Sequence, residues 1–333
     1  MKPKSIILLL VQLLVFLNAI GQASIMRKNF RITAYVELDD TVKDRTVPFD
    51  NIDYLNIAFC NPDHQGNLML PDGAKAMIDQ SKTYSNNNHH IRVMAVVGGK
   101  DAPAHILHRL IDADHREEFI KGVIEFLKKY GLSGVDIDFE KGMVNNDFPD
   151  FMKALGQAFQ KDGEGFEVTA AVGTDSFKGK DYITPETWRY TNFINIMSYD
   201  EFADNREAQE ASYELAEQDL LFWHKQMGIP PDSLGLGVPF YGYMFENGRV
   251  KGKNNEFPYR NVVLINSSAA ESDTIILNNH SVVIYNGLSM IRRKAKLSLD
   301  QSNGIMIWLI DQDAPSPYSL LDAILKTIKM NGN

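Results

Sequence analysis

Runs of apolar and β-branched residues recur along the chain and predict the strands of a β-sheet. They cover residues 32–38, 54–60, 91–99, 134–139, 166–173, 193–199, 233–239 and 304–310. Helical patterns separate several of these runs, with apolar residues three and four apart over 115–130 and a further helix expected to open at Asp147. Two more helices are expected over 214–225 and 289–299. Strands and helices therefore alternate along the chain.

This alternation predicts an α/β protein with the (β/α)8 TIM-barrel fold. The strands of such a barrel are buried on both faces, and most of the runs are almost continuously apolar. A doubly wound open sheet is the alternative, but no G-x-G-x-x-G motif follows the first run. The barrel is therefore the better interpretation of the pattern.

The stretch between the seventh and eighth runs is too long for one loop and one helix, because Met244 to Asn303 alone comprises 60 residues. Segments 262–268, 273–279 and 280–286 alternate like short strands. They predict a small β-rich insertion over about residues 245–288. Since no linker or repeat interrupts the sequence, we expect residues 24–333 to form a single domain.

The N-terminus predicts a cleavable signal peptide over residues 1–23. A basic MKPK precedes an apolar stretch, and the small residues Gly21 and Ala23 follow where a signal peptidase prefers them. A membrane anchor is the alternative, but the apolar stretch is shorter than the roughly 20 residues that span a bilayer. We therefore expect a secreted or periplasmic protein that has no stable membrane insertion after cleavage.

Composition limits the class of partner. The 333 residues are 44% hydrophobic and 23% charged, as in ordinary globular proteins. A net charge of −9 argues against sequence-independent binding of nucleic acid, and it suits a neutral or cationic substrate. Cys60 is the single cysteine, so no internal disulfide can form, and its place at the end of an apolar run favours buried packing.

Three carboxylates interrupt the fourth apolar run. Asp136, Asp138 and Glu140 alternate with apolar residues, so a strand would direct all three to one face, roughly 6 to 7 Å apart. In a barrel Glu140 would lie at the mouth, with the two aspartates successively deeper. An acid held beside other carboxylates keeps its proton closer to neutral pH, which is what a general acid for a poor leaving group needs.

A metal site or a satisfied buried network is the alternative for these acids. Strand spacing arranges them along a line rather than around an ion, and no Asp-Gly calcium loop occurs. The neighbouring His89 and His90 lack a completing metal-ligand spacing, so an exposed polar turn explains them better. We therefore expect acid–base chemistry, with no metal and no cofactor.

GVDIDFE at residues 134–140 resembles the D-x-D-x-E strand of family 18 glycoside hydrolases, the chitinase and endo-β-N-acetylglucosaminidase family. Other segments resemble further motifs of that family in the same order. They are VVGG at 96–99, NIMSYD at 195–200, LGLGVPFYGY at 234–243 and GIMIWLIDQD at 304–313. These segments lie on predicted strands and span almost the whole chain after the signal peptide. The resemblance implies the barrel independently of the apolar pattern.

The resemblance implies a substrate-assisted mechanism that retains the anomeric configuration. Glu140 would protonate the glycosidic oxygen while the substrate's own 2-acetamido carbonyl attacks the anomeric carbon. Asp138 would orient the acetamide N–H and stabilise the oxazolinium intermediate, and Asp136 would modulate the ionisation of Asp138. Tyr199 would donate its hydroxyl to the acetamide oxygen. Glu140 would finally act as the base for the incoming water.

The resemblance also implies which residues bind the sugar. Asp200 would contact the same sugar, and Trp308 would form the apolar floor beneath it. Tyr35 and Phe59, at the ends of the first two strands, would wall this subsite, and Met197 would pack beneath the acetamide. Packing within the barrel is the alternative for each of these aromatic and apolar side chains.

The chain departs from the family pattern near the acids. Ser133 stands where the family has an aspartate three residues before the motif, and we expect altered tuning of the acids rather than their loss. Phe139 replaces a common tryptophan and should point outward to pack against helices. Lys141 and Gly142 replace the usual aromatic and proline, which affects local substrate contacts.

The expected activity is hydrolysis of β-1,4-linked N-acetylglucosamine in chitin or chito-oligosaccharides by a monomeric enzyme. Two alternatives remain open at this point. One is an endo-β-N-acetylglucosaminidase that acts on the chitobiose core of N-glycans, and the other is a non-catalytic chitin-binding lectin on the same fold. Lectin-like members of the family typically lose the acid, whereas Glu140, Asp138 and Tyr199 are all present here.

Overall fold

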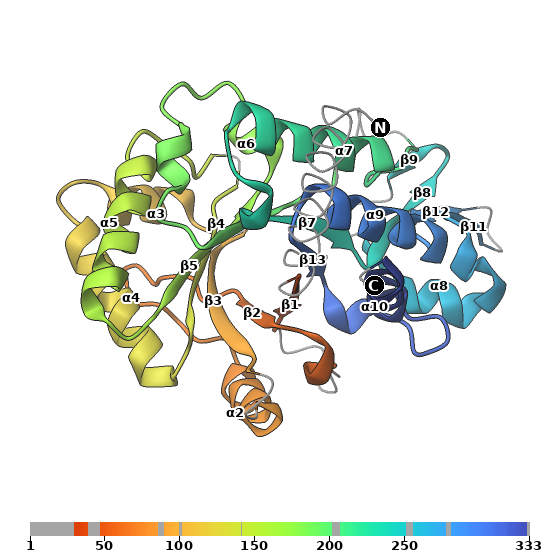
Figure 1. Ribbon diagram of the computed structural model, residues 1–333, viewed down its shortest axis with the longest axis horizontal. Helices are drawn as coiled ribbons and strands as arrows, with labels where there is room; N and C mark the ends of the chain where they lie inside the picture. The colour runs from red at the N-terminus through yellow and green to blue at the C-terminus, as the bar shows by residue number, and fades with distance from the viewer. Residues whose placement is uncertain are drawn as a thin grey trace, which may run out of the picture.

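A closed barrel of eight parallel strands forms the centre of the molecule (Figure 1). The computed structural model describes residues 30–38, 47–85, 90–99, 102–140, 142–201, 207–250, 256–277 and 281–331. The barrel strands are β1 (Arg31–Glu37), β2 (Tyr54–Ala58), β3 (Arg92–Gly98), β4 (Gly134–Asp138), β5 (Glu167–Val172), β6 (Phe193–Ile196), β7 (Leu234–Pro239) and β13 (Gly304–Trp308). Their order around the barrel is β1-β13-β7-β6-β5-β4-β3-β2. All eight predicted strands, and the predicted fold class, are confirmed.

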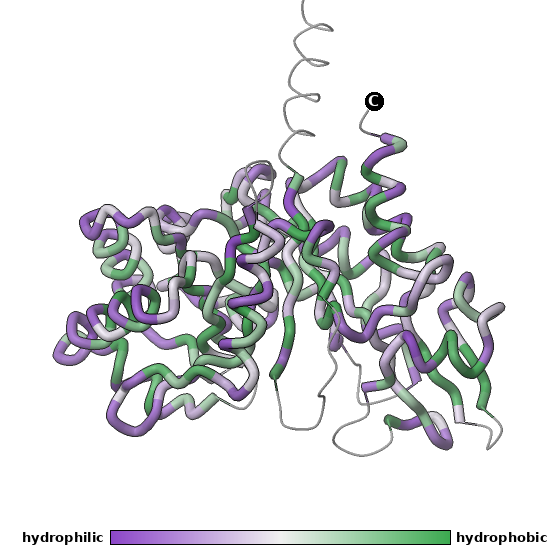
Figure 2. The backbone as a smooth tube through the Cα atoms, turned by 90° about the horizontal axis from the view of Figure 1, so that it is seen from below, coloured by the Kyte–Doolittle hydropathy of each residue, from purple (hydrophilic) through white to green (hydrophobic). Residues whose placement is uncertain are grey.

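Helices surround this barrel. They are α2 (Ala74–Tyr84), α3 (Ala104–Ile111), α4 (Arg116–Tyr130), α5 (Phe148–Asp162), α6 (Thr174–Phe177), α7 (Tyr213–Leu221), α9 (Leu288–Gln301) and α10 (Leu320–Asn331). Helix α4 shows why they form, with acids in its first turn, lysines in its last and Gly131 in the left-handed conformation beyond its end. In Figure 2 the outer helices alternate between hydrophilic and hydrophobic residues, as amphipathic helices packed on a sheet should.

A second sheet is inserted between β7 and β13, at the right of Figure 1. Its strands are β8 (Tyr241–Glu246), β9 (Arg249–Val250), β10 (Glu256–Pro258), β11 (Thr274–Ile276) and β12 (Val282–Tyr285). The predicted β-rich insertion is thus present, although it already begins at Tyr241 because β8 follows β7 almost directly.

One expected strand of the insertion is wrong. Segment 262–268 was expected to alternate like a strand, but it continues a helix, α8 (Tyr259–Ile265), and the 3-10 turn that follows. The buried side chains of α8 are Tyr259, Val262 and Val263, which are spaced three and four apart. Burial of this helical face against the inserted sheet outweighs the β preference of the two valines.

Two apolar layers lie on either side of the barrel wall. The larger fills the space between strands and helices and includes Cys60, whose predicted buried packing is confirmed. Phe139 also points outward as expected, where its ring stacks on Phe151 and contacts the tilted ring of Phe148, both on α5. The smaller layer lies inside the barrel and contains Tyr35, Ala58, Val96, Ala171, Met306 and Leu309.

Part of the predicted organisation lies outside the described residues, namely the signal peptide over 1–23, His89 and Lys141. Within the described ranges, none of the helices combines the length and the apolar character needed to cross a membrane.

Candidate active site

The acids of β4 lie on the inner face of the barrel wall. Asp136 and Asp138 are 0% and 2% exposed, whereas Glu140, two residues beyond the strand end, is half-buried at the carboxyl ends of the strands. This order of depth follows from the two-residue alternation of a strand. It places Glu140 at the end of a TIM barrel where catalytic groups lie.

Asp136 is held by two hydroxyl groups, one from the adjacent strand β5 and one from β1 across the barrel. Its Oδ2 accepts a hydrogen bond from Tyr35 Oη at 2.6 Å, and its Oδ1 accepts one from Thr169 Oγ1 at 2.5 Å. Asn195 Nδ2 donates in turn to Tyr35 Oη at 3.3 Å. Burial raises the pKa of Asp136 to about 6, while the bonds from Thr169 and Tyr35 oppose that rise.

Asp138 has a less satisfied environment. Its Oδ1 is buried and accepts no hydrogen bond from the described residues. Burial, and then the charges of Glu140 and Asp136, raise the pKa of Asp138 well above its usual value. A buried carboxyl with an unpaired oxygen is costly, so this side chain is prepared for an external donor.

Gly98 explains how β3 can approach Asp138 so closely. Its φ is +126°, and a Cβ atom there would lie 1.9 Å from the carbonyl oxygen of Asp138. The next residue, Gly99, donates its backbone N–H to that carbonyl at 2.8 Å. The two glycines of VVGG therefore fix the path of β4 below the mouth, which only residues without a side chain permit.

Ser133 lies at the opposite end of β4. Its Oγ accepts the backbone N–H of Val93 at 3.2 Å, so it serves the junction of β3 and β4. Seven residues separate Ser133 from Glu140, or roughly 23 Å along a strand. The missing family aspartate is therefore remote from the mouth.

The end of β6 supplies the facing wall. Met197 and Tyr199 point into the cavity, and Tyr199 Oη donates to Met306 Sδ at 3.6 Å. Burial and the carboxylates of Asp138 and Asp200 raise the pKa of the Tyr199 phenol well above its usual value. Tyr199 consequently remains a hydrogen-bond donor across the pH range in which proteins work.

Asp200 follows in the left-handed conformation, with φ of +62°. Its Oδ1 accepts hydrogen bonds from Tyr241 Oη at 2.6 Å and Tyr243 Oη at 2.8 Å. Both tyrosines come from β8 of the inserted sheet, and sequence reasoning missed their role. The signal was available, because residues two apart on a strand share a face.

Trp308 lies at the end of β13 among aromatic side chains. Its ring centroid is 5.5 Å from that of Tyr35 and 5.9 Å from that of Phe59. Tyr35 differs from the expectation that it walls a sugar subsite. It is 1% exposed and packs inside the barrel, where its hydroxyl bonds Asp136, so it supports the floor instead.

These side chains enclose a cavity of about 230 Å³. Its lining residues are Glu37, Phe59, Asp138, Glu140, Gly173, Ser176, Met197, Tyr199, Asp200, Glu256 and Trp308. The predicted site residues all line it except Asp136 and Tyr35, which lie beneath. Glu37 and Glu256 were not predicted, since nothing in the sequence marks the end of β1 or an insertion strand as part of this site.

A second cavity of about 390 Å³ adjoins the first, and both are lined by Gly173, Met197, Tyr199 and Asp200. The mouth of the barrel is therefore an extended groove rather than a closed pocket. Across the residues with defined positions, no cluster of three or more histidine, cysteine or acidic side chains is arranged to hold a metal ion.

Comparison with known proteins agrees with the barrel fold and identifies a protein family. The family model "Glycosyl hydrolases family 18" matches residues 31–313. An endochitinase of Manduca sexta is 32% identical over 207 residues, which cover 55% of this chain and 36% of that protein. The chain thus spans about a third of the length of this relative.

Two solved structures are similar over nearly their whole length. One is the chitinase ChiB from the chitin utilization locus of Flavobacterium johnsoniae, with 29% identity, a TM-score of 0.80, and coverage of 91% of this chain and 95% of that chain. The other is a chitinase from Bacteroides thetaiotaomicron, with 26% identity, a TM-score of 0.76, and coverage of 91% and 98%.

Proposed function

Since the chain belongs to glycosyl hydrolase family 18, we propose that it hydrolyses β-1,4-linked N-acetylglucosamine in chitin-derived oligosaccharides. The observation that carries this proposal is the pair formed by half-buried Glu140 and buried Asp138, whose Oδ1 accepts no bond from the described residues. An acid at a cavity mouth above an unsatisfied carboxyl suits a substrate that brings its own N–H donor. The acetamido group of N-acetylglucosamine is such a donor.

The arrangement of the two acids favours a nucleophile from the substrate. In the usual retaining mechanism two carboxyl groups flank the scissile bond, one as acid and one as nucleophile. Here Glu140 and Asp138 project from one face of one strand end, so they approach the sugar from the same side. Attack by the substrate's own acetamide carbonyl needs no protein carboxylate on the other side of the sugar, and it retains the anomeric configuration.

The remaining side chains fit this assignment. Glu140 protonates the leaving oxygen and later activates water. Asp138 accepts the hydrogen bond from the acetamide N–H and stabilises the positive charge that develops on the acetamide nitrogen. Tyr199, kept protonated by burial and nearby acids, donates to the acetamide oxygen. Trp308 supplies an apolar face for the sugar ring, and Asp200 supplies an acceptor for its hydroxyls.

Hydrolysis of tetra-N-acetylchitotetraose by wild type and by Glu140→Gln tests the proposal. Removal of the general acid should lower kcat by about 10²- to 10⁴-fold and leave oligosaccharide binding intact. Proton NMR of the first product should show the β anomer. An inert wild type that binds the tetrasaccharide as tightly as Glu140→Gln would instead support a lectin.

The second substrate class is separated by a glycoprotein assay. A product ladder from chitin oligomers, with no glycan released from a high-mannose glycoprotein, is expected of the proposed enzyme. Glycan release without the ladder would assign the chain to the endo-β-N-acetylglucosaminidase activity. Activity on neither substrate would refute both assignments.

A further inference from the structure

Outside the cavity and the acids of β4, a glutamate and a lysine are completely buried. Glu210, just before α7, and Lys294 of α9 are each 0% exposed. Charged residues of these types are almost never fully buried unless they are paired. We propose that Glu210 is a positioning residue that holds the Tyr199–Asp200 turn in its reactive shape and couples it to the inserted sheet. This inference rests on the proposed function, because it assigns a residue to that same site.

Glu210 contacts the backbone of the turn directly. Its Oε2 accepts the backbone N–H of Asp200 at 3.2 Å, and its carbonyl oxygen accepts the N–H of Glu201 at 3.1 Å. Asp200 has a φ of +62°, in the left-handed region that few residues other than glycine occupy, although aspartate does so more often than most. The acceptor on its N–H is therefore part of what maintains this conformation.

The turn carries two groups that face the sugar. Tyr199 and Asp200 both line the catalytic cavity, so a relaxed φ at Asp200 would move both side chains. The carboxylate of Asp200 is separately held by Tyr241 and Tyr243. Glu210 fixes the backbone and the tyrosines fix the side chain, so the two supports are complementary.

Neighbouring side chains connect this support to α9, through Lys294, and to the end of the insertion. Its Nζ donates to the carbonyl of Ala211 at 2.8 Å, and Asn286 Nδ2 donates to the same carbonyl at 3.0 Å. Gln209 Nε2 donates to the carbonyl of Tyr285, the last residue of β12, at 2.8 Å. Residues 209–211 thereby join the turn at the end of β6 to the insertion and to α9.

The electrostatics agree with a mutually stabilising pair. Burial raises the pKa of Glu210 to about 8, and Asp200 and Glu256 add to that rise, whereas Lys294 opposes it. Burial lowers the pKa of Lys294 to about 8, and Glu210 is the strongest influence in the opposite direction. Each group therefore favours the charged form of the other inside the fold.

Substitution of Glu210 tests the inference, with kcat/KM for tetra-N-acetylchitotetraose as the readout. Glu210→Gln keeps an oxygen acceptor and should remain within about threefold of wild type, whereas Glu210→Leu leaves the Asp200 N–H unpaired and should lose roughly 10-fold or more. Should Glu210→Leu not fold, Glu210→Leu with Lys294→Met removes both buried charges and still lacks the acceptor. The same loss is expected of it.

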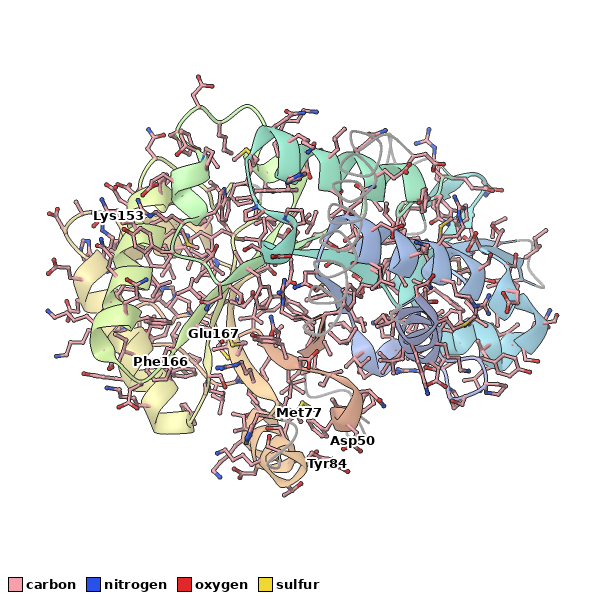
Figure 3. The ribbon with its side chains drawn as sticks, viewed as in Figure 1. Asp50, Met77, Tyr84, Lys153, Phe166 and Glu167 are labelled. Carbon is pink, nitrogen blue, oxygen red and sulfur yellow. The ribbon has the colours of Figure 1, made fainter. Side chains whose placement is uncertain are left out.

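A double-mutant cycle separates positioning from stability alone. Glu210→Leu combined with Asp200→Asn should be about as impaired as the worse single variant, because both act on one turn. The matched control is Glu167→Leu, which removes an acid bonded to Tyr54 and Arg92 at the start of β5, the opposite end of the barrel (Figure 3). Glu167→Leu should lower stability, and its effect on kcat/KM should be independent of Asp200→Asn, so that the two fold-changes multiply in the double variant.

Full activity in folded Glu210→Leu or in the double variant with Lys294→Met would overturn the inference, as would multiplicative effects with Asp200→Asn. If wild type is inert, the proposed hydrolysis fails, and the inference is then judged by affinity for the same tetrasaccharide. Because Asp200 lines the cavity in either case, the same pattern is expected in Kd: about threefold or less from wild type for Glu210→Gln, and roughly 10-fold or more weaker binding for Glu210→Leu. Equal affinities would overturn it.

Discussion

Replacement of Tyr35 by phenylalanine removes one hydroxyl group and leaves the packed ring in place. That hydroxyl donates to Asp136 Oδ2 at 2.6 Å inside the barrel, where Thr169 also donates to the same carboxylate. Burial already raises the pKa of Asp136 to about 6, and the bond from Tyr35 opposes the rise. Its loss should therefore raise the pKa of Asp136 further, so that the Asp136–Asp138 pair gives up its first proton at a higher pH.

The magnitude follows from the worth of a hydrogen bond to a charged group, about 1.5 to 3 kcal/mol. At about 1.4 kcal/mol per pKa unit, this corresponds to a rise of about one to two units for the Asp136–Asp138 pair. A folded pKa above the ordinary value means that the stability contributed by protonated Asp136 is complete below pH 4 and is lost as the pH rises through about 6. Tyr35→Phe should thus destabilise the protein more at pH 7.5 than at pH 4.5.

The assay is kcat/KM for a fluorogenic chitobioside between pH 4 and 9, with urea unfolding at the two ends. The acid limb of the profile should move to higher pH in Tyr35→Phe. Tyr54→Phe is the matched control, because Tyr54 Oη donates to Glu167 Oε2 at 2.9 Å at the far end of the barrel (Figure 3). It should lower stability without moving the acid limb. An unmoved acid limb in Tyr35→Phe, or the same movement in both variants, would refute the reasoning.

Three further predictions concern the groove and its support. Gly98→Ala should lower the free energy of unfolding by more than about 3 kcal/mol, since its Cβ would lie 1.9 Å from the Asp138 carbonyl oxygen. The control is Gly163→Ala, where φ is +80° and no atom lies within 4 Å of the added Cβ, and it should cost about 1 kcal/mol. Urea denaturation checks both, and equal costs would contradict the clash. Trp308→Ala should weaken calorimetric affinity for tetra-N-acetylchitotetraose by roughly 3- to 10-fold, and unchanged affinity would remove it from the floor. Ser133→Asp should keep kcat within about twofold of wild type and leave the pH dependence of kcat unmoved, because position 133 is roughly 23 Å from Glu140 along a strand; a moved profile would show long-range tuning.

The sequence by itself determined the barrel and the row of acids. Both depend on short-range periodicity: continuous apolar runs mark strands buried on two faces, and a two-residue alternation directs Asp136, Asp138 and Glu140 to one side. The helix over 116–130 could also be predicted, because the apolar residues of its buried face lie close together in the sequence. Segment 262–268 could not, since two adjacent valines fit a strand or a helix until their packing partners are known.

Only the tertiary structure decided which residues meet. Tyr35 and Asp136 are 101 residues apart in the sequence, and closure of the barrel brings them together. Tyr35, which was predicted to wall the sugar subsite, therefore donates a hydrogen bond beneath the cavity. Tyr241 and Tyr243 reach Asp200 because the insertion begins beside the end of β6, and Lys294 reaches Ala211 across 83 residues. Periodicity carries no information about such distances in sequence. The sequence does not show that Glu210 is buried, or that Lys294 lies near enough to favour its charged form. Both facts come from the structure.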